Sequence, residues 1–122
     1  MAVIAIIGAG MAGLTAARHL QAGGHSCILF DKSRGLGGRM ATRRVEDLQF
    51  DHGAQYFTAR SDAFCAQVDA WKADGAIASW FADAWVGAPT MTAPARALAA
   101  GMIVVSGCEV AKLERQETGW RI

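Results

Sequence analysis

The 122-residue sequence has few prolines, few cysteines and almost no net charge. It contains two prolines, three cysteines, and twelve basic against eleven acidic residues, for a formal charge of +1. A charge this small gives no reason to expect binding to nucleic acid or to a membrane surface. Cys27, Cys65 and Cys108 lie far apart, with no CxxC or Cys/His spacing, so we expect no metal site. We interpret all three as small buried side chains in a reducing compartment.

Long apolar runs are also missing, and we expect no leader sequence. The first apolar run, Val3 to Ile7, is far shorter than the roughly 20 residues that a membrane span needs. The N-terminus has no basic region, so we expect no signal peptide and a cytoplasmic location. Hydrophobic residues still make up 52% of the chain and charged residues 19%, which is enough apolar material to build one folded domain.

A glycine-rich turn follows the first apolar run. Val3–Ile7 predicts a buried parallel strand, and Gly8, Gly10 and Gly13 follow it with GxGxxG spacing. Gly8 is expected to make the tight turn, and Gly10 to let a pyrophosphate approach the backbone. Gly13 is expected to let the following helix pack close to the strand. This order of strand, turn and helix is typical of a dinucleotide-binding unit.

The segment after this turn predicts a helix over 11–22, because apolar residues recur on one of its faces. Its first-turn N–H groups, at Met11 and Ala12, lack helical partners and would stabilise a diphosphate. Cys27–Phe30 predicts the second strand, and Asp31 closes it. A carboxylate there can accept both ribose hydroxyls of a dinucleotide, which argues against a 2′-phosphate. The pattern by itself does not distinguish NAD from FAD.

A second glycine turn, rich in arginine, begins directly after Asp31. Residues 32–44 read KSRGLGGRMATRR. An NAD site needs no such turn, whereas an FAD site does, because a second phosphate and a ribityl chain continue past the first turn. The glycines allow close backbone approach, and Arg34 or Arg39 can pair with a phosphate oxygen. We interpret Arg43 and Arg44 as a solvated loop. The cofactor-binding residues expected here are Lys32, Ser33, Arg34, Gly37, Gly38, Arg39 and Met40.

Together the two turns resemble those of the flavin-containing amine oxidase superfamily, most closely its renalase-like bacterial members. Two further stretches carry the resemblance: FDHGAQYFT at 50–58, which looks like that family's loop beside the flavin ring, and WVGAPTM at 85–91 followed by ARAL at 95–98. The resemblance implies FAD as the cofactor, with contacts from Val110 to the adenine. It also implies contacts near the flavin ring from Gly53, Ala54, Gln55 and Tyr56.

The sequence departs from the family in two places. The segment between Trp80 and Trp85 is shorter than is usual, and Thr90 stands where the family has glycine. A threonine resists a positive φ, so we expect a different turn there. The family's chains are also more than twice as long. We therefore expect the N-terminal portion of a larger flavoenzyme, with sheet edges and an apolar face left uncovered. Self-association or a partner chain would cover them.

The fold class expected is α/β, a Rossmann-like FAD-binding domain of the glutathione-reductase type with a parallel sheet and the start of a substrate domain. We expect one partial domain over 1–122. Residues 1–60 would hold the first βαβ unit, the second turn and the flavin loop. Residues 61–92 would form a substrate-domain-like excursion, with Ser61 capping a helix on which Phe64, Val68 and Trp71 recur at helical spacing. Residues 93–122 would return through a helix, capped by Thr92 and ending at Gly101, to a third parallel strand at 102–106 beside the second strand, and then to a hairpin.

The resemblance implies a flavin-dependent oxidoreductase. Such an enzyme takes a hydride from a small molecule, either a dihydropyridine such as an NAD(P)H isomer or an amine, and passes electrons to O₂, giving H₂O₂. Catalytic residues stay unassigned; His52, Gln55 and Tyr56 are the candidates near the ring, and His52 fits a loop residue that bonds its neighbours equally well. Two alternatives stay open: a non-catalytic ADP-binding module, and an NAD-dependent dehydrogenase, which leaves the second turn unused.

Overall fold

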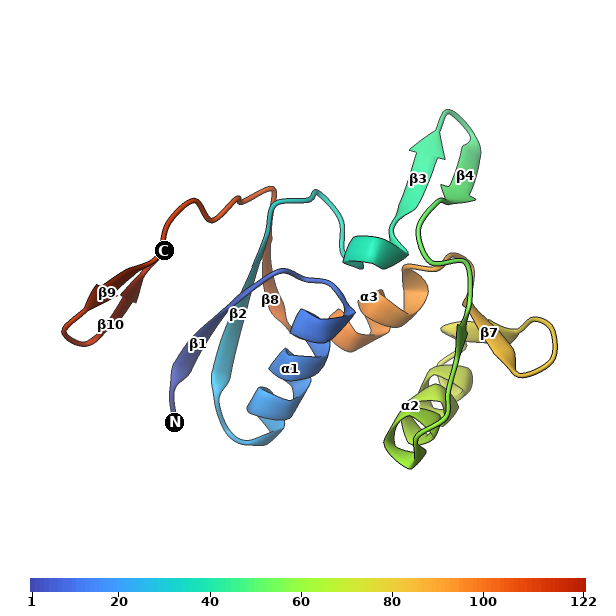
Figure 1. The fold of residues 1–122 in the computed structure, drawn as a ribbon, viewed down its shortest axis with the longest axis horizontal. Helices are drawn as coiled ribbons and strands as arrows, with labels where there is room; N and C mark the ends of the chain where they lie inside the picture. The colour runs from blue at the N-terminus through green and yellow to red at the C-terminus, as the bar shows by residue number, and fades with distance from the viewer.

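A computed structural model describes all residues, 1–122. The helices are α1 (Met11–Ala22), α2 (Asp62–Ala73) and α3 (Ala93–Ala99), with one 3₁₀ turn, η1 (Gly38–Met40). The strands in chain order are β1 (Val3–Ile7), β2 (Ser26–Asp31), β3 (Thr42–Val45), β4 (Leu48–Asp51), β5 (Phe57–Thr58), β6 (Ile77–Ser79), β7 (Ala84–Gly87), β8 (Ile103–Ser106), β9 (Glu114–Gln116) and β10 (Gly119–Arg121). Figure 1 shows their arrangement. None of the helices combines the length and the apolar character that crossing a membrane requires.

A parallel sheet in the order β1-β2-β8 forms one half of the molecule. Its register pairs Ala5 with Ile28, and Ile28 with Ile103. The predicted Rossmann-like fold is confirmed, because β1, α1 and β2 form a βαβ unit and β8 returns beside β2 as expected. The elements agree closely with those predicted: β2 is one residue longer at each end, and β8 begins one residue later.

The core of this half lies between one face of the sheet and the helices α1 and α3. Cys27 and Leu29 of β2 point into it, and Leu14 and Ala17 of α1 meet them, all four being buried. This alternation follows from the period of two in a strand and the spacing of three to four in a helix. Arg18 fixes α1 to the end of α3, because its guanidinium donates to the carbonyl oxygens of Leu98 and Ala100.

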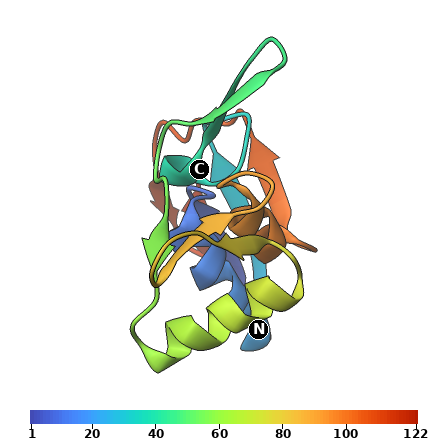
Figure 2. The same ribbon diagram turned by 90° about the vertical axis from the view of Figure 1, so that its right-hand side faces the viewer.

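Residues 57–92 form a second unit, in which α2 packs on an antiparallel sheet in the order β5-β7-β6. Figure 2 shows α2 in front of α1. The predicted cap is confirmed, since the N–H of Phe64 donates to Ser61 Oγ at 3.3 Å. The predicted apolar face is also confirmed: Val68 and Trp71 are buried, and Phe64 stacks edge-on against Trp71 at 6.0 Å between centroids.

Several expectations about local structure are wrong. Arg43 and Arg44 do not lie in a loop; they belong to β3, which forms a hairpin with β4. Cys65 is exposed rather than buried, because it lies one position past Phe64 and so off the buried face of α2, and Cys108 is only partly buried. Thr92 begins α3 without a side-chain cap, its hydroxyl pairing instead with that of Thr90 at 2.9 Å. That helix ends at Ala99, short of the predicted Gly101.

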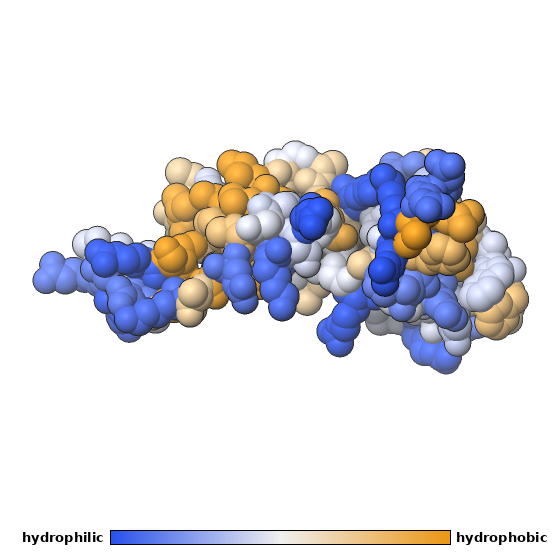
Figure 3. Space-filling view, turned by 90° about the horizontal axis from the view of Figure 1, so that it is seen from above, coloured by the Kyte–Doolittle hydropathy of each residue, from blue (hydrophilic) through white to orange (hydrophobic).

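Thr90 is not among the residues with positive φ, so this position avoids the conformation that threonine resists. The predicted C-terminal hairpin is confirmed as β9 and β10, which extend away from the parallel sheet (Figure 1). The sheet face opposite α1 stays uncovered: Val3 is 75% exposed, Ile103 62% and Ile7 54%. Figure 3 shows apolar atoms gathered over this part of the molecule.

Candidate dinucleotide site

A cavity of about 750 Å³ opens at the carboxyl ends of the parallel strands. This is the edge where α/β sheets bind ligands. The predicted site residues that line it are Gly8, Gly10, Met11, Ala12, Asp31, Lys32, Ser33, Gly38, Arg39, Met40 and Val110. They come from four separate segments of the chain, so the fold brings together most of what the two glycine turns predicted.

The first turn leaves room for a ligand at Gly10. Gly8 has a φ of +102°, which strains any residue with a side chain, and its N–H donates to Phe30 O at 2.7 Å. A Cβ added at Gly10 would meet only the Cα of Gly38, at 3.9 Å, so the space beside it is free. Gly10 also offers no side chain to cap α1, and the first turn of α1 holds no acidic residue. The helix N–H groups are therefore available to an anion.

Gly13 has a different role from Gly10. It does not line the cavity, and a Cβ at this position would overlap the carbonyl oxygen of Gly8. Its lack of a side chain is what lets α1 pack against the end of β1, as predicted. Gly13 therefore supports the first turn by allowing close packing behind it, and it does not line the cavity.

Asp31 lies at the end of β2, with both carboxylate oxygens engaged. Oδ2 accepts the N–H of Ala9 at 2.6 Å, and Oδ1 accepts the N–H of Ser33 at 2.7 Å. Partial burial raises the pKa of Asp31, but these backbone hydrogen bonds, the Ser33 hydroxyl and the charge of Lys32 outweigh it and bring the pKa below its ordinary value. The carboxylate is therefore ionised at neutral pH and retains lone pairs for further donors.

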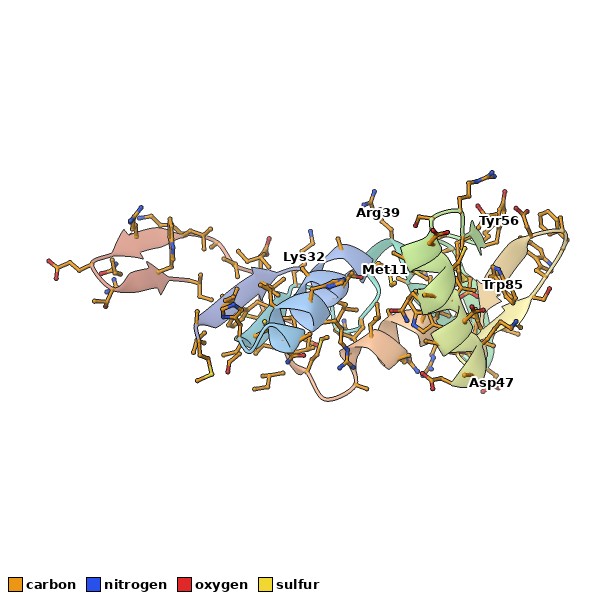
Figure 4. All side chains as sticks on the ribbon, turned by 90° about the horizontal axis from the view of Figure 1, so that it is seen from below. Met11, Lys32, Arg39, Asp47, Tyr56 and Trp85 are labelled. Atoms are coloured by element: carbon orange, nitrogen blue, oxygen red, sulfur yellow. The ribbon has the colours of Figure 1, made fainter.

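The second turn lies against the first. Gly37 and Gly10 form an isolated parallel bridge, and the N–H of Gly37 donates to Ala9 O at 3.1 Å. Gly37 and Gly38 have φ of +106° and +55°, in the region that favours glycine. Figure 4 shows the side chains of Lys32 and Arg39 extending on the same side of the molecule, close to Met11. Neither cation takes part in a salt bridge, so both are available to phosphate oxygens.

The predicted flavin loop is attached to the second turn but does not line this cavity. The N–H of Ala54 donates to Arg39 O at 2.9 Å, and a Cβ at Gly53 would overlap the same oxygen. Gln55 and Tyr56 are exposed, and Tyr56 packs against Trp80 and Phe81 at 5.7 and 5.5 Å between centroids. His52 is exposed as well, and Arg34 is exposed and is not among the lining residues. The structure therefore does not bring these residues into the cavity.

A second, mostly apolar hollow of about 1010 Å³ runs between α1 and α2. It shares Met11, Ala12 and Met40 with the first cavity, and Ala54 lies in its lining. Trp71 lines it too, and the indole N–H of this buried residue has no acceptor. The two hollows are thus continuous around the start of α1.

Four residues that line the first cavity were not predicted: Ile7, Phe30, Cys108 and Glu109. Gly37 lines it too, as expected for the second turn. Ile7 is the last residue of β1, Phe30 is the last but one of β2, and the pair 108–109 follows β8. Because parallel strands present their carboxyl ends at one edge of the sheet, the residues at the end of each predicted strand could have been predicted to line the cavity. Cys108 is held there by its N–H, which donates to Asp31 O at 2.9 Å.

The model of the NAD(P)-binding Rossmann-like domain family matches residues 6–68, more than half of the chain. The chain belongs to this family. The matched segment contains both glycine turns, Asp31 and the predicted flavin loop, so the family's sequence pattern coincides with most of the cavity described above.

Similar proteins confirm the predicted relationship to flavin-containing amine oxidases. A putative flavin-containing monoamine oxidase, AofH, of Mycobacterium tuberculosis is 38% identical over 63 residues, which are 52% of this chain and 14% of that protein. A 4,4′-diapophytoene desaturase of Staphylococcus haemolyticus is 44% identical over 50 residues, 41% of this chain and 10% of that protein. This chain therefore spans only a small part of the curated relatives it matches.

The structure of THI4 from Thermovibrio ammonificans superposes on 98% of this chain and 44% of that protein, with a TM-score of 0.57 and 15% sequence identity. At this identity the likeness supports the Rossmann-like fold and nothing finer. It extends beyond the segment matched by the family model, to include the return strand β8 and the hairpin β9-β10.

Proposed function

We propose that this chain is the FAD-binding N-terminal portion of a flavin-dependent oxidoreductase. The observation that carries the proposal is the pairing of two glycine turns across one cavity, with Asp31 on one wall and Arg39 on another. A site for the ADP half alone needs only the first turn, Asp31 and the segment near Val110. The second turn extends the same cavity toward Arg39 and Met40, as a longer dinucleotide requires.

The residues have separate roles in this proposal. Asp31 accepts the ribose hydroxyls, and Val110 contacts the adenine with its backbone. The N–H groups of Met11 and Ala12 bind the diphosphate beside Gly8 and Gly10, supported by the charges of Lys32 and Arg39. Ser33, Arg34, Gly38 and Met40 continue the site toward the flavin, whose ring would meet the loop of Gly53, Ala54, Gln55 and Tyr56.

We propose the same division of the chain as the sequence predicts: residues 1–60 for the first unit and flavin loop, 61–92 for a substrate-domain-like excursion, and 93–122 for the return. FAD, when bound, supplies the acceptor for a substrate hydride and the route of electrons to O₂, which gives H₂O₂. The substrate class is a dihydropyridine nucleotide, as in renalase-like enzymes, or an amine, which the names of the relatives support. Neither nucleic acid nor membrane is a partner, and the location is the cytoplasm.

The experiment is a visible absorption spectrum of the purified chain before and after incubation with FAD, followed by gel filtration. Flavin bands that elute with the protein support the proposal. Gly10→Val is the control, because its side chain would occupy the space open to the diphosphate. Equal flavin retention by both proteins would mean that FAD binds elsewhere, and a colourless wild-type protein that rejects added FAD would contradict the proposal.

A second candidate is a non-catalytic module for ADP-containing ligands. One observation favours it: Gln55 and Tyr56, predicted beside the flavin ring, lie outside the cavity that contains Asp31 and Gly10. Calorimetric titration with ADP and with FAD separates the two functions. Equal affinities would favour the ADP module, whereas tighter binding of FAD would show that the second turn contributes. Tight binding of NAD without FAD would instead favour a dehydrogenase.

A further inference from the structure

Asp31 connects three segments of the chain that line the cavity. Its carboxylate accepts the N–H of Ala9 in the first turn and the N–H of Ser33 at the start of the second, at 2.6 and 2.7 Å. Its backbone carbonyl accepts the N–H of Cys108, beyond β8, at 2.9 Å. The side chain predicted to bind ribose therefore joins the first glycine turn to the start of the second, and the backbone of the same residue joins β2 to the segment after β8.

The bond to Ala9 is the one with the largest consequence. Ala9 has 0% of its surface exposed, and Asp31 is the acceptor for its N–H. Without the carboxylate, a buried N–H would lose its partner, and such groups are costly to leave unpaired. The backbone at Ala9 would then have to move, and Gly8 and Gly10, the residues on either side, line the part of the cavity where a diphosphate would lie.

We propose that Asp31 is a positioning residue for diphosphate binding, in addition to its role toward ribose. The carboxylate holds the Gly8–Gly10 turn in the conformation that leaves the N-terminus of α1 open to phosphate oxygens. Each carboxylate oxygen uses one lone pair on a backbone N–H and keeps another for a ribose hydroxyl. The inference rests on the dinucleotide binding proposed above, and it concerns the phosphate end of that site.

A ribose-only role and a positioning role predict opposite results for a ligand without ribose. If Asp31 acted through ribose alone, replacing it by asparagine would not weaken the binding of inorganic pyrophosphate, which has no ribose. Removing one negative charge near the phosphates would even tighten binding, because like charges repel. If Asp31 holds the turn, the same replacement weakens pyrophosphate binding, since asparagine cannot accept both N–H groups with a charged carboxylate.

The test measures binding of ADP, 2′,3′-dideoxy-ADP and inorganic pyrophosphate to wild-type protein and Asp31→Asn by calorimetry. We expect Asp31→Asn to weaken pyrophosphate and 2′,3′-dideoxy-ADP by about 10-fold, the effect of roughly one charge-assisted hydrogen bond, and to weaken ADP by more, because ADP also loses the contact to its ribose hydroxyls. Asp69→Asn, which makes the same change at an exposed position on α2, is the matched control and should leave all three affinities unchanged. Unchanged or tighter pyrophosphate binding by Asp31→Asn would overturn the proposal.

A measurement on the free protein keeps the inference testable if Asp31→Asn fails to fold. The amide proton shifts of Ala9 and Ser33 are followed by NMR as the pH is lowered, and both should move together as Asp31 takes up a proton. The other ionisable groups in the lining are Lys32, Arg39, Cys108 and Glu109, and Glu109→Gln removes the only other carboxyl group among them. If the amide proton shifts of Ala9 and Ser33 do not change with pH, the positioning role of the Asp31 carboxylate is refuted. Wild-type protein that binds neither ADP nor FAD would instead refute the proposed function, while the two amides still report on Asp31.

Discussion

Gly10 and Gly37 form a parallel bridge that joins the two glycine turns, although 26 intervening residues separate them in the chain. The bridge makes one cavity out of two motifs that the sequence presents separately. It also explains why glycine occurs at 37 and 38, where φ is positive, since any other residue would be strained at the point of contact. The two turns therefore act as one binding surface, and substitutions in either should affect the same ligand in different ways.

Adding a side chain at Gly10 should affect ligand binding, whereas adding one at Gly13 should affect stability. Gly10→Val places its side chain in free space, so we expect an unchanged fold. We expect ADP affinity to fall by roughly 10-fold or more. Gly13→Ala would collide with the Gly8 carbonyl, so we expect a loss of about 1–3 kcal/mol in the free energy of unfolding. Urea unfolding and ADP titration of both variants measure the difference. A Gly13→Ala protein as stable as wild type would contradict the close packing of α1.

Arg39 should favour the longer ligand. The residue lines the cavity at the second turn, whereas Asp31, the predicted ribose site, lines it at the end of β2. We expect Arg39→Ala to weaken FAD by about 10-fold and ADP by less, because ADP carries the same two phosphates but lacks the ribityl–flavin half that Arg39 would also serve. Arg43→Ala, which removes the same charge from the exposed strand β3, is the control. Equal losses for ADP and FAD would remove Arg39 from the flavin half of the site.

Trp71 offers a test of a buried donor without an acceptor. Its ring packs against Phe57 and Phe64, while its indole N–H has no partner. Trp71→Phe keeps an aromatic ring and removes that N–H, so we expect a stability change within about 1 kcal/mol, since relief of the unpaired group offsets the lost volume. Trp71→Ala should cost about 3–5 kcal/mol. Urea unfolding followed by circular dichroism measures both, and equal losses would show that the N–H has a partner.

The first βαβ unit could be predicted in detail because its signals are local. A continuous apolar strand, a glycine turn, a helical face and an acid follow one another within residues 3–31, and each is set by near neighbours. The hairpin β3-β4 could not be predicted in this way, because the arginines in TRRV hide the alternation typical of a strand. Its turn depends on Glu46, whose φ is +54° and whose side chain gives little sign of such a turn.

The least predictable part of the site is the flavin loop. Tyr56 was expected beside the cofactor, yet its ring contacts Trp80 and Phe81, which come from the turn between β6 and β7. Only the tertiary structure brings these rings together. By contrast, Ala54 and Gly53 do approach the second turn through Arg39 O, so the backbone of the motif reaches the site even though its larger side chains do not.

The uncovered sheet face should drive self-association. Ile103 is 62% exposed on that face, and its register places it beside Ile28 and Ala5. We expect Ile103→Lys to reduce association, as read by sedimentation velocity, because a charge cannot be buried cheaply in an apolar contact. Leu48→Lys is a matched control, since Leu48 is 61% exposed on the separate β3-β4 hairpin. Association that is insensitive to Ile103→Lys, or equally sensitive to both, would place the contact elsewhere.

Asp31 should also make stability depend on acid pH. The hydrogen bonds from Ala9 and Ser33 outweigh partial burial and lower the pKa of Asp31 in the folded protein. A group whose folded pKa is lowered adds stability that is fully present above its unfolded pKa, about 3.9 for an aspartate, and is lost as the pH falls through the folded value. We therefore expect the melting temperature of wild-type protein to fall more steeply below pH 4 than that of Asp31→Asn. Thermal melts of both proteins between pH 7 and pH 3 measure this. Parallel curves would mean that the carboxylate is no better stabilised in the folded chain than in the unfolded one, and would count against its two backbone hydrogen bonds.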